Sequence, residues 1–208
     1  MLLYISGNQY IYLLNLTYCM KIPVKLWYWF TACFTWTVAT TVVMVRQATH
    51  FYCFESIHHT RKFSIFELML PANRSSMGIL IRQINQLPHA DCAESLHALK
   101  GQLTVDFFYM PAVYGCVFLL LIAASIRSRG WLSTFLKIWA WLQIVAWLSD
   151  ITENCYIFYK IAHPFICTPF VFFCYRIVEI LKWGLSCGGF VAAVLVLVLS
   201  LFLKPKTT

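Results

Sequence analysis

The chain has 208 residues, of which 61% are apolar and 12% are charged, and its formal net charge is +8. A soluble monomer cannot bury or cover that much apolar side chain, so the composition excludes an ordinary soluble globular protein. The sequence therefore predicts an integral membrane protein that forms one membrane domain over residues 1–208 and is surrounded by the lipid bilayer.

The chain offers two candidate starts, Met1 and Met20. Residues 1–19 contain no basic residue and include several amides, so they make a poor signal peptide. Met20 precedes Lys21 and an apolar run, which is typical of a signal anchor. Both starts stay open, and because no cleavage site of small residues follows the run, we expect the run to be kept as a helix.

Four apolar runs are long enough to cross a bilayer as helices. Each has about the 20 residues that cross about 30 Å of hydrocarbon. They cover residues 26–45, 107–126, 131–149 and 183–203. Backbone groups in lipid must be bonded within the segment, and the runs lack the strict alternation of barrel strands. We therefore predict an all-α fold, a polytopic membrane four-helix bundle.

Helix start and stop signals predict that three of these helices extend beyond the outer leaflet. Asp91 and Glu94 have the spacing of a capping box, which predicts one helix from there to residue 126, kinked near Pro111. Thr168 offers an N-cap before Pro169, so the fourth helix begins well before its apolar part. The third helix runs on to residue 161 in the same way.

Residues 46–105 are predicted to form a folded outer loop of about 60 residues. Large apolar side chains are too frequent there for a flexible linker, and one set recurs at helical steps: Met77, Leu80, Ile81, Ile84 and Leu87. We expect these five to mark an amphipathic helix that lies on the membrane-proximal face of the bundle. Cys53 and Cys92 are candidates for a disulfide in an oxidising compartment, with Cys155 and Cys167 as competing partners.

Basic residues flank the runs on one side. They are Lys21 and Lys25 before the first run, Arg127 and Arg129 between the second and third, and Lys204 and Lys206 after the fourth. The positive-inside rule then places both termini in the cytoplasm and the long loop outside. The bases are dispersed over flanks rather than gathered in one stripe, so the net charge indicates topology and not nucleic-acid binding.

The few charges within or beside the runs gather at the outer end of three of them. Asp150, Glu153 and Asn154 share one helix face, because they stand at positions i, i+3 and i+4. Arg176, Glu179 and Lys182 repeat at steps of three on the next helix, at the matching height. Opposed charges at one height should pair. Asp106 and Tyr114 on the second helix are also candidates for this site.

The acids in this set outnumber the bases by four to two. The surplus carboxylates either face water, share a proton or hold a cation. One interpretation is a salt-bridge network that only fixes helix packing, and the other is a cavity open to the outside that binds an ion or a polar head group.

Two classes of function follow. The first is a membrane protein that handles an ion or a polar or lipid ligand, including an enzyme that acts on a lipid head group. The second is a non-catalytic scaffold or accessory subunit of a membrane complex. Four helices are few for a transporter acting alone, so transport would require a homo-oligomer or a membrane-protein partner. The sequence identifies no catalytic residue, metal or cofactor.

Several short motifs carry a resemblance. They are Phe66-Glu67, Asp106-Phe107-Phe108 leading to Tyr114-Gly115, and Asp150-Ile151-Thr152-Glu153-Asn154. In order and spacing, over roughly residues 60–160, they resemble a loose group of small bacterial four-span membrane proteins, although Tyr109 stands where a phenylalanine is expected. The resemblance implies a bacterial inner membrane and adds Glu67 as a candidate fifth acid. It implies no substrate.

Overall fold

The computed structural model describes residues 22–56, 59–165 and 167–202. Four helices in these ranges are long and apolar enough to cross a membrane: α2 (Val24–Ala48), α5 (His89–Arg127), α6 (Gly130–Ala162) and α7 (Pro169–Phe202). Each contains one of the four predicted apolar runs, so the prediction of four candidate membrane helices is confirmed. The two candidate starts, Lys21, Lys204, Lys206 and the end of the last run at residue 203 lie outside the described residues.

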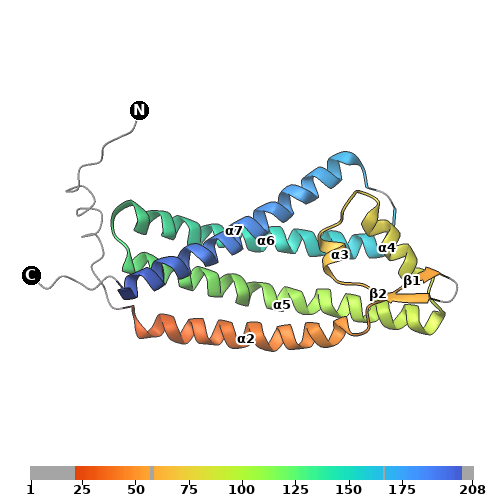
Figure 1. The fold of residues 1–208 in the computed structure, drawn as a ribbon, viewed down its shortest axis with the longest axis horizontal. Coiled ribbons are helices and arrows are strands. Elements are labelled where there is room, and N and C mark those ends of the chain that lie inside the picture. The colour runs from red at the N-terminus through yellow and green to blue at the C-terminus, as the bar shows by residue number, and fades with distance from the viewer. Residues whose placement is uncertain (1–21, 57–58, 166, 203–208) are drawn as a thin grey trace, which may run out of the picture.

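Helix α5 is the central helix, since α2, α6 and α7 all pack along it. Helix α2 packs on α5, whereas α7 packs on both α5 and α6. Figure 1 shows α7 slanting across α6 and diverging from α5 as it approaches the loop elements. The α5–α6 link, the start of α2 and the end of α7 lie at one end of the molecule, and the loop elements lie at the other (Figure 1).

Three helices are much longer than a bilayer core requires. Helix α5 has 39 residues and is therefore about 58 Å long, against about 30 Å of hydrocarbon. Its start differs from the predicted capping box, because Pro88 is the N-cap residue and no side chain caps the helix. Glu94 instead accepts a hydrogen bond from His50 at 2.5 Å. The start of α7 has the predicted form, with the backbone N–H of Val171 donating to Thr168 Oγ1 at 3.3 Å.

The segment between α2 and α5 covers residues 49–88, which is shorter than predicted because both helices extend into the predicted loop. It forms β1 (Tyr52–Ser56), β2 (His59–Lys62), α3 (Phe66–Met69) and α4 (Ser76–Asn85). The strands pair antiparallel, with Tyr52 opposite Lys62. The described fold is otherwise helical, as predicted, and this short hairpin is an element that the prediction did not include. The loop aromatics suit a short pleated pair, a signal that is weak beside the helical periodicity of the rest.

The loop packs down onto the helix ends with its own apolar core. Helix α4 buries Met77, Leu80, Ile81 and Ile84, the residues that recur at helical spacing. They join Leu99 and Leu103 of α5, and Ile157 and Ile161 of α6, in one cluster with the buried loop aromatics Phe51 and Phe63. The loop thereby covers the extended ends of α5 and α6.

The candidate disulfide is not formed, since Cys53 and Cys92 are both free thiols. Cys53 lies on β1 and is buried in the loop core, where burial raises the pKa of its thiol. Cys92 lies in the first turn of α5 and is placed near Asn85 instead, with 4.0 Å between the sulfur and Oδ1.

Candidate functional site

Buried charges from three helices meet at one level of the molecule. Asp106 of α5, Asp150 of α6 and Lys182 of α7 are all buried. Each lies about 20 residues, and so about 30 Å, from the end of its helix at the α5–α6 link. Because that length matches one hydrocarbon core, the charges lie near a membrane interface if the link lies near the other.

Lys182 is the cation at the centre of the cluster. Its ammonium group donates to Asp150 Oδ1 at 3.1 Å and also contacts Glu153 Oε2. The hydroxyl of Tyr114 donates to the other oxygen of Asp150 at 2.9 Å. Both oxygens of Asp150 are therefore bonded, and the predicted pairing of α6 acids with an α7 base is present at Lys182.

Glu153 also contacts Tyr175, which the sequence analysis did not select. The Tyr175 hydroxyl lies 3.4 Å from Glu153 Oε1 and 3.0 Å from the carbonyl oxygen of Met69 in α3. Tyr175 thus connects the buried acid to the loop. Its position could have been found, because Tyr175, Glu179 and Lys182 follow steps of four and three along one face of α7.

Asp106 has a different environment from the other acids. Asn154 donates its amide N–H to Asp106 Oδ2 at 2.6 Å, and both side chains are buried. No basic side chain of the described residues lies within ion-pair distance of Asp106, and its second oxygen accepts no hydrogen bond from them. One of the two surplus acids expected from the sequence is therefore Asp106, and the other lies in the Lys182 cluster, where two acids share one cation.

Three predicted members, Arg176, Glu179 and Glu67, lie apart from the Lys182 cluster. Arg176 pairs with Glu179 of its own helix at 2.8 Å, and its guanidinium is partly exposed, so it does not reach α6. Glu67, implied by the resemblance, is outside the site: it pairs with Arg61 of β2 at 2.8 Å. Hydrogen bonds from the Arg61 guanidinium lower the pKa of the Glu67 carboxyl. This corrects the implied fifth acid, because the local turn presents Glu67 to the hairpin rather than to the helices.

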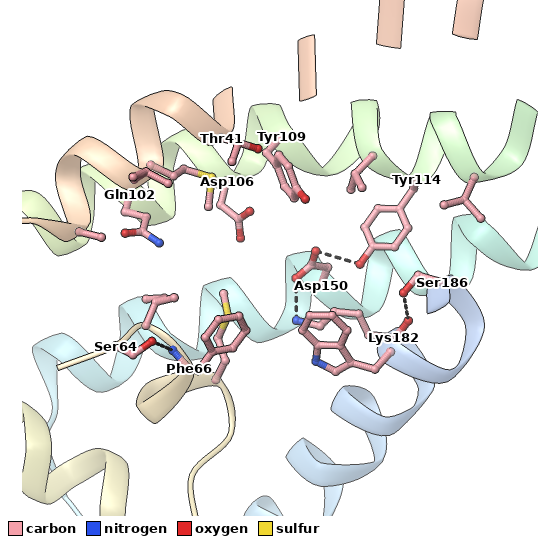
Figure 2. Close-up of a pocket in the computed structure, with 18 of the residues that line it drawn as sticks. Thr41, Ser64, Phe66, Gln102, Asp106, Tyr109, Tyr114, Asp150, Lys182 and Ser186 are labelled. Carbon is pink, nitrogen blue, oxygen red and sulfur yellow. Dashed lines mark hydrogen bonds and ion pairs between the residues drawn. The ribbon is translucent and has the colours of Figure 1, made fainter. Parts of the chain in front are cut away.

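A cavity of about 580 Å³ opens beside these charges, between α2 and α7 and next to α3 (Figure 2). Its polar end contains Asp106, Asp150 and Lys182. The remaining walls are mainly apolar or aromatic and include Met44, Val45, Phe66, Met69, Val113, Val117 and Trp183. The site is therefore amphipathic, because charged side chains and mainly apolar or aromatic side chains line the same cavity.

Gln102 and Tyr109 also line the cavity, and neither was selected from the sequence. Figure 2 shows both side chains pointing from α5 into the same space as Asp106. Gln102 is only 3% exposed, and its side-chain oxygen Oε1 has no hydrogen-bond partner. The helical spacing 102, 106, 109, 113 could have indicated this face of α5 once Asp106 was chosen.

Among the described residues, no group of three or more His, Cys, Asp or Glu side chains is placed to hold a metal ion. No protein family, curated protein or solved structure matches the chain.

Proposed function

We propose that this protein is an integral membrane protein that binds an amphiphilic, lipid-like ligand in the cavity between α2 and α7. The polar group of the ligand lies at the Asp106 end, and its apolar part lies against Met44, Val113 and Trp183. The observation that carries this proposal is that one cavity joins a buried carboxylate without a cation to a long apolar wall.

The unpaired groups favour a ligand over the scaffold interpretation. In a purely structural network each buried acid is stabilised by contact with a base, as Asp150 and Glu153 both contact Lys182. Asp106 and Gln102 do not fit that description, because both side chains line the cavity and each has an oxygen that accepts no hydrogen bond from the described residues. A buried acceptor without a partner costs roughly 1–3 kcal/mol, and a bound polar group would remove that cost.

The walls of the cavity indicate access from the bilayer. Val45, Phe66 and Trp183 line the cavity and are nevertheless 61%, 52% and 39% exposed, so they stand at its mouth. These side chains come from α2, the loop and α7, and α2 packs on α5 rather than on α7. A lipid-like molecule can therefore enter sideways between α2 and α7 without first crossing water.

We further propose a bacterial inner membrane, cytoplasmic termini, and a four-helix bundle whose extended helix ends and folded loop face outward. In a background without other reactive thiols, a membrane-impermeant thiol reagent should label Ala72→Cys in intact cells and should label Thr207→Cys only after lysis. The reverse pattern would place the cavity at the cytoplasmic leaflet.

The binding proposal is tested with three probes that share a 12-carbon chain, namely dodecylamine, dodecanol and dodecanoate. At least one should raise the unfolding temperature of the protein in phosphatidylcholine nanodiscs, because a ligand that binds only the folded state stabilises it. Val113→Trp, which fills the cavity, should abolish the shift. Val191→Trp on the exposed face of α7 should keep it. If no probe raises the unfolding temperature, the proposal is rejected and the interpretation as a scaffold or accessory subunit remains.

A further inference from the structure

We infer that the polar group of the ligand is a protonated primary amine, held by Asp106 and Gln102 with Tyr109 beside them. This inference rests on the proposed function, since it concerns the same cavity. It names the chemical class of the head group, which an amphipathic cavity alone does not specify.

The charges around the cavity leave a place for a cation. Lys182 already contacts two carboxylates, Asp150 and Glu153, and Arg176 is paired with Glu179. Asp106 is 4% exposed and receives only the neutral amide of Asn154 from the described residues. An anionic head group would meet this carboxylate and find Lys182 already occupied. A cationic one would supply the missing counter-charge to a largely buried carboxylate.

The hydrogen-bonding groups at the polar end also specify a donor. Asp106 offers a carboxylate oxygen and Gln102 offers Oε1, and both are acceptors without a described donor. The two residues are four apart on α5, so their side chains lie one turn apart on the same face, as Figure 2 shows. A primary ammonium group carries three donors and no acceptor. Two of its protons would satisfy these oxygens, and the Tyr109 oxygen lies on the same wall for the third.

The surroundings favour an alkylammonium group over a bare metal ion. Calcium takes six to eight oxygen ligands, and the described residues hold no cluster of that kind. The rest of the wall is apolar, which suits the carbon chain attached to an amine. Aromatic rings of Phe66, Tyr109 and Trp183 line the same space and can attract a cation through their faces.

The three 12-carbon probes test this inference through their relative affinities. In the wild type, dodecylamine should bind at least tenfold more tightly than dodecanol or dodecanoate, since a charge-assisted hydrogen bond contributes on the order of a tenfold difference. Asp106→Asn should reduce this preference to within about twofold, because it removes the charge and keeps the shape. Asp91→Asn, an exposed acid on the same helix, is the matched control and should keep the preference.

Gln102→Leu provides a second measurement that leaves the Asp106–Asn154 bond untouched. It should weaken the binding of dodecylamine more than the binding of dodecanol. If Asp106→Asn fails to fold, Gln102→Leu alone tests the amine inference. Equal affinities of the three probes in the wild type, all abolished by Val113→Trp, would overturn the amine inference while the proposed function stands. An unchanged amine preference in Gln102→Leu and Asp106→Asn would also overturn it. Binding of no probe would overturn both.

Discussion

The two halves of α5, α6 and α7 use opposite means of packing. Near the α5–α6 link, which we call the link half, the buried cluster consists of apolar residues, three of them small alanines: Val117, Leu120, Leu121, Ala124, Leu136, Ala140 and Ala193. Near the loop, which we call the loop half, the helices bury Asp106, Asp150, Glu153, Glu179 and Lys182. Small residues allow close helix contact in a membrane, whereas paired charges hold helices at side-chain distance. The cavity accordingly lies in the loop half.

Three glycines of α7 show where the change occurs. A Cβ on Gly189 would lie 3.0 Å from Gln143 Nε2, and one on Gly188 would lie 2.9 Å from Trp139 Cζ2. A Cβ on Gly184, one turn nearer the loop, would meet nothing within 4 Å. The Trp139 and Gln143 side chains both donate to the carbonyl of Leu185 at 3.0 Å. Gly188 and Gly189 therefore lie in the close contact between α6 and α7, whereas Gly184 lies on an exposed face of α7.

The largest effect is expected from Lys182→Met in the loop half. It leaves Asp150 and Glu153 buried without their cation, which should lower the free energy of unfolding by about 3–5 kcal/mol. Thermal unfolding in detergent measures the loss. Lys137→Met, an exposed lysine of the link half, is the control and should melt like the wild type. Equal melting of the two variants would mean that the cluster is not a stabilising pair.

A smaller change is expected when Glu153→Gln is added to Lys182→Met. The double variant buries one negative charge fewer, so it should regain part of the stability that the single change lost. The comparison of single and double variants isolates the coupling between the two side chains. Strictly additive losses would show that Lys182 and Glu153 act independently.

In the link half, Gly189→Leu should destabilise the protein by about 1–3 kcal/mol, because the new side chain would overlap Gln143 and Leu121. Gly184→Leu introduces the same side chain where there is room, and it should leave the unfolding temperature nearly unchanged. Similar losses of stability in both variants would contradict the assignment of Gly189, but not Gly184, to the close α6–α7 contact.

The smallest effect concerns the half-exposed pair Arg61 and Glu67, which lies in the loop outside both halves. The pKa of Glu67 is lower in the folded state, so the pair contributes stability above the unfolded pKa of about 4.3 and loses it as pH falls through the folded pKa. Glu67→Gln should therefore cost up to about 1 kcal/mol at pH 7, with the difference from wild type vanishing in stronger acid. A difference that does not depend on pH would exclude the charge as its cause.

Much of the helical framework could be predicted because its signals are local. Runs of about 20 apolar residues specify candidate membrane helices, and the Thr168-Pro169 start follows from local backbone chemistry. The prediction of an Asp91–Glu94 capping box was wrong for a tertiary reason, since Glu94 is hydrogen-bonded to His50, just after the end of α2. The β1–β2 hairpin was missed because its short strands depend on the loop core for their stability.

The sequence by itself determined the class of protein, the number of long apolar helices and the common level of Asp106, Asp150 and Lys182, because hydropathy and rise per residue are properties of each helix alone. Only the tertiary structure decided that Lys182 forms ion pairs with two acids, that Asp106 pairs with no base of the described residues, and that Gln102 lines the cavity. Those outcomes depend on the rotation of each helix about its axis and on the divergence of α7. Both are set by contacts such as Gly189 against Gln143, between residues far apart in the chain.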